Sequence, residues 1–412
     1  MPPPFFRGLA ALLAACGLLI YFIPSAVVHA AEQERPEPPA QPQVEAGSAY
    51  LMDRRTGTVL YQMNADQAMY PASITKIITG IVALESGTDL SGMVTISKEA
   101  RHEDGTRVYL AEGEQQTLDD LIQAMLINSG NDAATAVAEY IDGSKEKFAE
   151  RMNAFIQEKI GVHNSHFTNP HGLPDELQYT TAADMAHIAQ YAMANEKFRS
   201  IVGTKKRPWS GAEWTSDLEN HNQLLGRYEG TTGVKNGFTN ASGYTLVASA
   251  ERDGMELIGV LLKAPSVKQL YLDMEKLLDY GFAGFEPKQL FDKGETYTRY
   301  AAAHSLEYTA EEPIWAVLPK GETPRLQIDD LGTLSVISSL GIVEAGHMQP
   351  LPLPAEESAD RTGDSAASQE GAGDQRSSDV LSWLKVFAWM VLALIFAWIG
   401  YLRWQRKRRS GF

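Results

Sequence analysis

Two segments that lack the composition to fold limit where the folded part of the chain can lie. Residues 32–46 are rich in proline, glutamine and glutamate, and residues 351–380 are rich in serine, alanine, glycine and aspartate. Neither segment contains an aromatic residue. We therefore predict two disordered linkers. Roughly 300 residues lie between them, enough for one large domain and one small domain.

The first 31 residues have the pattern of a signal peptide. They carry one charge, Arg7, and a long apolar run that ends in Val28-His29-Ala30. The run Leu13-Ala14-Ala15-Cys16 also resembles a lipoprotein box, although apolar residues continue well beyond the cysteine. Cys16 is the only cysteine, so its removal with the signal peptide would exclude a disulfide framework and a cysteine nucleophile.

A second apolar run lies near the other end of the chain. Residues 386–402 are uncharged and mostly apolar, with Trp383 and Trp404 at their flanks. This length is just sufficient to cross a bilayer, and a basic tail follows. We expect a transmembrane anchor over residues 381–403, a cytoplasmic tail over 404–412, and the folded part outside the cytoplasm as a single-pass protein of the cell membrane. An amphipathic helix on the membrane surface is the alternative, but the segment is apolar all round.

The charge distribution argues against nucleic acid as a partner. The formal net charge is −16, and six of the positive charges, Arg7 and the five basic residues within 403–409, lie at the two ends. The rest of the chain therefore carries −22. Such an acidic region would repel phosphate backbones.

The central region alternates between strand and helix patterns. A strand pair surrounds an Arg55-Thr56-Gly57 turn, and residues 118–127 repeat apolar positions at helical spacing after Thr117 as N-cap. A capping box at Thr181 to Asp184 predicts a further helix through Tyr191. For residues 47–285 we predict an α/β (α+β) fold with helices against an antiparallel sheet. For residues 286–350 we predict a small β domain, since Ile314 to Leu318 and Leu334 to Ile337 are β-like runs.

A serine and a lysine three residues apart provide the first sign of chemistry. Ser73 and Lys76 stand in Pro71-Ala72-Ser73-Ile74-Thr75-Lys76, at the predicted start of a helix. Residues i and i+3 of a helix share a face, so a neutral Lys76 could take the Ser73 proton. The isoleucines at 74, 77, 78 and 81 form an adjoining apolar stripe, which leaves Ser73, Lys76 and Gly80 on the other edge. Burial of this kind lowers the pKa of a lysine.

Two further motifs turn this weak signal into a strong one. Ser129-Gly130-Asn131 ends the predicted helix 118–127, and Lys235-Asn236-Gly237-Phe238-Thr239 precedes an extended run over residues 244–250. The order and spacing of S-x-x-K, S-x-N and K-x-G resemble the penicillin-binding protein and serine β-lactamase superfamily. The stretches SGNDAATAVAEYI, MNAFIQEKIGVHNSHFTNPHGL and GVKNGFTNASGYTLVASA resemble the low-molecular-mass D-alanyl-D-alanine carboxypeptidases, from about Tyr50 to Phe285.

The resemblance implies a penicillin-binding/β-lactamase-like transpeptidase fold and a peptidase that removes the terminal D-alanine from peptidoglycan stem peptides. It assigns Ser73 as nucleophile, Lys76 as its base and Ser129 as proton relay. Asn131 would hold the substrate amide, Lys235 would attract the terminal carboxylate, and the N–H groups of Ser73 and Phe238 would form the oxyanion hole. It implies inhibition by β-lactams and a spacer or contact role for the small β domain. We expect no cofactor and no metal.

One residue departs from the family pattern. Asn236 stands where the family usually has threonine or serine; its amide can still donate to a carboxylate, with Gly237 and Thr239 beside it. The change tunes the carboxylate subsite, marks a catalytically silent wall-binding or β-lactam-binding homologue, or fits an altered substrate.

Two other interpretations are weaker. A β-lactamase would carry an E-x-x-L-N loop between the second and third motifs, but Glu176 and Glu219 lie in unrelated surroundings and are interpreted as surface acids. The histidines at 163, 166 and 171 fit no common metal-ligand spacing.

Overall fold

The computed structural model describes residues 40–300 and 305–351. The predicted signal peptide, most of the first linker, nearly all of the second linker and the predicted membrane anchor with its basic tail lie outside these ranges. Within them, no helix has both the length and the apolar character needed to cross a membrane.

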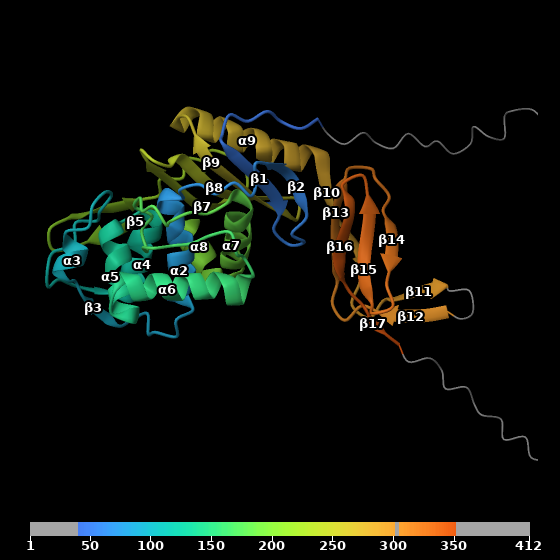
Figure 1. Ribbon diagram of the computed structural model, residues 1–412, viewed down its shortest axis with the longest axis horizontal. Coiled ribbons are helices and arrows are strands. Elements are labelled where there is room, and N and C mark those ends of the chain that lie inside the picture. Colours follow the sequence, from blue (N-terminus) through green and yellow to red (C-terminus); the bar gives the residue numbers. More distant parts are fainter. Residues whose placement is uncertain (1–39, 301–304, 352–412) are drawn as a thin grey trace, which may run out of the picture. The chain divides into compact units, whose positions relative to one another are not determined.

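A five-stranded antiparallel sheet organises the larger part of the described chain (Figure 1). Its strand order is β2-β1-β9-β8-β7, so β1 pairs directly with β9, although more than 200 residues of chain separate them. The predicted hairpin around Arg55 forms β1 and β2, and the predicted extended run 244–250 lies within β8. The strands are β1 (Ser48–Asp53), β2 (Val59–Met63), β7 (Thr231–Thr239), β8 (Gly243–Arg252) and β9 (Met255–Ala264).

Side chains alternate between the two faces of this sheet, and each face has its own core. Along β9, Ile258 and Val260 enter the core beneath most of the helices, whereas Leu257 and Leu261 enter the core beneath α9 (Val267–Gly284). Figure 1 shows α9 on one side of the sheet and the other helices on the opposite side. These are α2 (Lys76–Leu84), α3 (Lys98–Arg101), α4 (Leu118–Ile127), α5 (Asn131–Asp142), α6 (Lys145–Phe155), α7 (Ala182–Ala194) and α8 (Glu196–Val202), with a 3₁₀ helix, η2 (Ala72–Thr75), and a π-helical turn, η3 (Ile156–Ile160).

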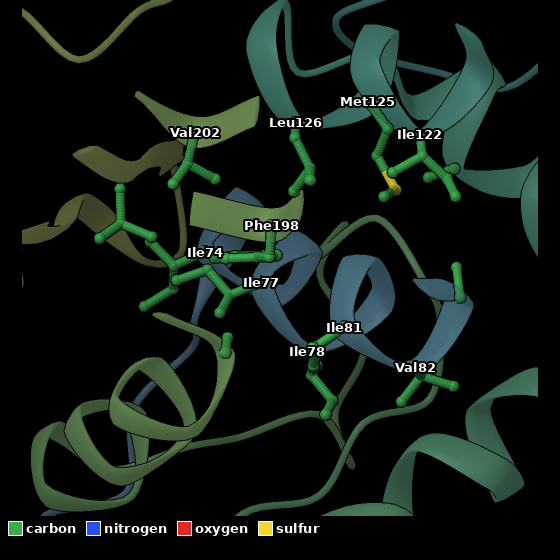
Figure 2. Close-up of a cluster of buried hydrophobic side chains, with 14 of the residues drawn as sticks. Ile74, Ile77, Ile78, Ile81, Val82, Ile122, Met125, Leu126, Phe198 and Val202 are labelled. Atoms are coloured by element: carbon green, nitrogen blue, oxygen red, sulfur yellow. The ribbon is translucent and has the colours of Figure 1, made fainter. Parts of the chain in front are cut away.

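The helix that follows the predicted nucleophile is buried on every side. Its isoleucines pack with Ile122, Met125 and Leu126 of α4 and with Phe198 and Val202 of α8 (Figure 2). The predicted apolar stripe is confirmed, and Gly80, predicted on the other edge, is packed as well. A Cβ at this glycine would lie 3.0 Å from Leu126 and 3.3 Å from Phe198, so the small residue lets α4 and α8 approach α2 closely.

The predicted helix caps are confirmed. Helix α4 spans Leu118–Ile127, and the Thr117 hydroxyl accepts a hydrogen bond from the Asp120 N–H at 3.0 Å. Helix α7 begins after Thr181, whose hydroxyl accepts from the Asp184 N–H at 3.0 Å. Both threonines satisfy N–H groups that a helix start leaves unpaired.

The described residues from Phe285 to Leu351 form strands and no helix. A pair β10-β13, a sheet β11-β12-β17 and a sheet β14-β15-β16 are all antiparallel. The strands are β10 (Phe285–Phe291), β11 (Thr296–Tyr300), β12 (Ser305–Thr309), β13 (Ile314–Pro319), β14 (Arg325–Ile328), β15 (Thr333–Ser338), β16 (Gly341–His347) and β17 (Gln349–Pro350). Two two-stranded sheets complete the larger part, namely β3 (Met93–Thr95) with β4 (Gln115–Thr117) and β5 (Lys206–Ser210) with β6 (Thr215–Glu219).

Candidate active site

Ser73 lies in η2, immediately before α2, and is only partly buried among buried neighbours. A 3₁₀ helix has three residues per turn, so side chains at i and i+3 lie directly above one another. The Lys76 Nζ is accordingly 3.0 Å from the Ser73 Oγ. The hydroxyl of Thr245 donates to the Pro71 carbonyl at 2.9 Å and fastens the start of η2 to β8.

Lys76 is fully buried, with no exposed surface. Besides Ser73, its amine lies 2.7 Å from the Asn131 Oδ1 and 2.7 Å from the His171 carbonyl oxygen. Burial, reinforced by the charge of Lys235, holds the pKa of Lys76 well below its ordinary value, although acidic side chains nearby oppose this. A neutral lysine amine in this position can accept the serine proton.

The second motif forms the turn between α4 and α5. Ser129 is buried with φ of 65°, and Asn131 begins α5. The Asn131 side chain accepts from Lys76 and donates to the Asp104 carbonyl at 2.6 Å. Asp132 accepts hydrogen bonds from the N–H groups of Val108 and Leu110 at 3.1–3.2 Å, which fixes the loop before β4 against α5.

The third motif lies on β7, at the edge of the sheet. Lys235 is buried, its Nζ donates to the Asn236 carbonyl at 3.0 Å, and burial lowers its pKa to about 7. A Cβ at Gly237 would lie 2.6 Å from the Ser73 backbone nitrogen and 3.0 Å from the Ala72 Cβ. Strand β7 therefore passes directly beside the predicted nucleophile, and only glycine fits at this point.

The last residues of this motif surround the end of β7. Asn236 is partly buried, and the exposed Phe238 ring stacks on Tyr244 with ring centres 4.4 Å apart. The Thr239 hydroxyl accepts from the Ser242 N–H at 3.0 Å and lies 2.8 Å from the Ser242 Oγ. Thr239 thus caps the β7–β8 turn, and its part in carboxylate binding stays a prediction.

Sequence reasoning missed the loop that supplies the His171 carbonyl to Lys76. The Thr79 hydroxyl of α2 donates to the Pro170 carbonyl at 2.6 Å, and Asn169 Oδ1 accepts from the Gly172 N–H at 2.7 Å. Gly172 has φ of 92°, and a Cβ there would lie 1.9 Å from the Ala72 carbonyl oxygen. The glycine in NPHGL was the available sequence signal for this loop, because only glycine fits at that position.

The His171 ring leads from this loop to a partly buried ionic cluster. Its Nδ1 accepts from the Leu173 N–H at 3.2 Å, so the proton of the neutral ring is on Nε2, 3.4 Å from Glu103 Oε2. The same Glu103 oxygen accepts from Thr135 at 2.7 Å and from Lys145 at 3.0 Å. Burial opposes ionisation of Glu103, but these partners together hold its pKa well below the ordinary value. No cluster of three or more potential metal ligands occurs among residues 40–300 and 305–351.

The site joins a serine to a buried lysine whose pKa is lowered, and the edge strand beside them carries a second buried lysine. This arrangement defines a serine acyl-transfer enzyme. Residues 34–266 match the family model described as D-alanyl-D-alanine carboxypeptidase. The chain therefore belongs to the D-alanyl-D-alanine carboxypeptidase family.

Individual relatives agree with this family. The chain is 35% identical to D-alanyl-D-alanine carboxypeptidase DacF of Bacillus subtilis over 295 residues, which is 68% of this chain and 74% of the relative. It is 36% identical to DacC of Escherichia coli over 299 residues, covering 68% and 70%. Among solved structures it is similar to penicillin binding protein 5 of Haemophilus influenzae, with a TM-score of 0.67 and 30% identity over 76% of this chain and 98% of that one.

Proposed function

We propose that Ser73 of this serine D-Ala-D-Ala carboxypeptidase attacks the penultimate D-alanine carbonyl of a peptidoglycan stem peptide. Lys76 takes the hydroxyl proton as the Oγ–carbonyl bond forms. The amide bond then breaks, and the terminal D-alanine leaves after its nitrogen receives a proton. Water adds to the Ser73 ester, the ester bond breaks, and the shortened peptide is released with the serine restored. The observation that carries this proposal is the 3.0 Å contact between Lys76 Nζ and Ser73 Oγ.

The other site residues are assigned by their places around this pair. Ser129, in the turn before Asn131, relays the proton to the leaving nitrogen, and the Asn131 amide holds the substrate. The N–H groups of Ser73 and Phe238 stabilise the oxyanion, which the close approach of Gly237 to the Ser73 nitrogen supports. Lys235 attracts the terminal carboxylate while it is protonated.

β-Lactams would inhibit the enzyme by acylating the same serine. Their amide carbonyl is attacked by Ser73, and the ring opens to leave an acyl-enzyme. We infer slow hydrolysis of this ester, because the sequence lacks the glutamate loop by which class A β-lactamases activate a deacylating water.

The test uses a labelled penicillin and a pentapeptide ending in D-Ala-D-Ala. The wild-type protein should form a covalent adduct and release D-alanine. Ser73→Ala should abolish both with little loss of thermal stability, and Lys76→Ala should be nearly as damaging, because the pair acts as a unit. Labelling that persists in Ser73→Ala would show that another residue is the nucleophile.

We also propose that the enzyme is held at the cell membrane by residues 381–403, with its site outside the cytoplasm. This rests on the apolar run and basic tail of the sequence, which lie outside the described residues. Removing residues 380–412 should move penicillin-binding activity from the membrane fraction to the soluble fraction. A truncated protein that stays with membranes would point to lipidated Cys16 or a retained N-terminal segment.

A further inference from the structure

A pocket of about 430 Å³, not used in the mechanism above, lies next to the segment that leads to Ser73. Its lining includes Tyr70, Glu176, Tyr179, Ala241, Ser242 and Lys263. Two backbone hydrogen bonds between Met69 and Thr180, at 2.8 and 2.9 Å, hold the segments of Tyr70 and Tyr179 side by side. The pocket is therefore built by four segments: the one before η2, the loop after NPHGL, the β7–β8 turn and the end of β9.

Two opposite charges face this pocket. Glu176 and Lys263 are its charged lining residues, and both are exposed. Within residues 40–300 and 305–351, neither side chain forms a salt bridge or a hydrogen bond. Glu176 can therefore bind an ammonium group of a ligand, and Lys263 can bind a carboxylate, without breaking an existing ion pair.

The substrate peptide, if it runs along β7, extends toward the same pocket. Strand β7 is an edge strand, along which an extended peptide can pair. The terminal carboxylate lies at Lys235, and the attacked carbonyl lies at Ser73, beside Gly237, two residues further along β7. An extended chain advances about 3.3 Å per residue. The third residue of the stem peptide then lies beside Phe238, one residue beyond Gly237, and its side chain can extend toward the turn residues Ala241 and Ser242 that line the pocket.

We propose that this pocket receives the side chain of the third stem-peptide residue, a diamino acid. Glu176 binds the side-chain ammonium, and Lys263 binds the side-chain carboxylate of a diamino diacid such as diaminopimelate. The inference rests on the proposed function, because that function sets the direction of the peptide. It gives Glu176 a role in place of the surface acid that the sequence suggested.

The experiment compares D-alanine release from three acyl-Xaa-D-Ala-D-Ala peptides by the full-length protein. Xaa is meso-diaminopimelate, L-lysine or Nε-acetyl-L-lysine. We expect kcat/KM to be highest for the diaminopimelate peptide and to fall about fivefold from the lysine to the acetyl-lysine peptide. An exposed charge pair contributes about 1 kcal/mol, which corresponds to this factor. Glu176→Gln should remove the advantage of lysine and leave acetyl-lysine unchanged. Lys263→Gln should remove only the difference between diaminopimelate and lysine.

Glu150→Gln and Lys268→Gln, at exposed positions of α6 and α9, are matched controls that should leave all ratios unchanged. Equal labelling by penicillin would show that each variant is folded. An unchanged lysine to acetyl-lysine ratio in Glu176→Gln would overturn this inference while the release of D-alanine still supports the function. No release from any of the three peptides would overturn the proposed function, and the inference with it.

Discussion

Lys76 and Lys235 are two buried lysines whose proposed tasks require opposite charge states. Lys76 has to be neutral to accept the serine proton, whereas Lys235 has to be charged to attract a carboxylate. Burial lowers the pKa of both amines, and the charge of Lys235 lowers that of Lys76 further. In the proposed mechanism, the charge that binds the substrate thus also keeps the base in its reactive form.

The dependence of kcat/KM on pH should show whether its decrease at alkaline pH results from deprotonation of Lys235. Its pKa of about 7 in the free enzyme predicts that kcat/KM for D-alanine release falls as the pH rises through that value. Lys235→Arg should be less active, but its alkaline limb should vanish between pH 6 and 9 because a guanidinium stays charged. The measurement is kcat/KM on one pentapeptide from about pH 5.5 to 9.5. The same alkaline limb in both proteins would assign it to another group.

Asn236 allows a direct test of whether the departure from the family pattern weakens the site. If its amide replaces the usual hydroxyl imperfectly, Asn236→Thr should raise kcat/KM. One good hydrogen bond to a charged group contributes about 1.5–3 kcal/mol, which corresponds to a rise of roughly 10- to 150-fold. D-Alanine release by the two proteins is the measurement. Activity that appears only in the variant would favour a silent natural protein, and lower activity would show that asparagine suits a different substrate.

At the scale of elements, the site depends on how closely β7 approaches η2. Gly237→Ala would place a methyl group 2.6 Å from the Ser73 nitrogen, so one backbone segment has to move. A displacement of about 1 Å can cost about 100-fold in rate, and we expect a loss of that size in the rate of penicillin acylation. Stopped-flow acylation together with thermal unfolding measures it.

Gly254→Ala separates this effect from simple destabilisation. Gly254 lies in the β8–β9 turn with φ of 77°, and no atom lies within 4 Å of the place that a methyl group would take there. Alanine at this position should lower stability through backbone strain and leave acylation unchanged. Equal losses of acylation in the two variants would contradict the steric account of Gly237.

The helices and loops around the site show why some of its features could be predicted from the sequence and others could not. The extent of α4 and the start of α7 follow from local signals, namely apolar periodicity and a capping threonine. The His171 carbonyl beside Lys76 could not be predicted this way, because a backbone contact between distant segments carries no side-chain signature. The contact between the Thr239 hydroxyl and Ser242 is different, because it joins residues three apart in one turn and the Thr239-to-Ser242 spacing was a local signal for it.

For the whole molecule, the two buried lysines oppose folding below the pH at which free lysines lose their protons. In the unfolded chain Lys235 keeps its proton up to about pH 10.5, whereas the folded chain releases it from about pH 7. Because the unfolded state binds more protons in this window, the free energy of unfolding rises with pH. The stability linked to Lys235 is complete above the unfolded pKa and is lost as the pH falls to about 7.

Lys235→Met should remove this part of the pH dependence. We expect the slope of unfolding free energy against pH to decrease by about 1.4 kcal/mol per pH unit between pH 7.5 and 9.5. Urea titrations at several pH values, followed by tryptophan fluorescence, provide the measurement. Lys268→Met, at an exposed position of α9, should keep the wild-type slope. A slope that is equal in all three proteins would mean that Lys235 stays protonated after folding.

The contact between Gly172 and the Ala72 carbonyl bears on how resistance to antibiotics can evolve in this chain. Position 172 has neither the space nor the backbone conformation for another residue, since φ is 92° and a Cβ would meet that oxygen at 1.9 Å. Any replacement has to displace η2, and with it Ser73, the proposed nucleophile toward both β-lactam and stem peptide. A substitution at this position that slows acylation by a β-lactam should therefore slow D-alanine release as well, so the two reactions cannot be separated here.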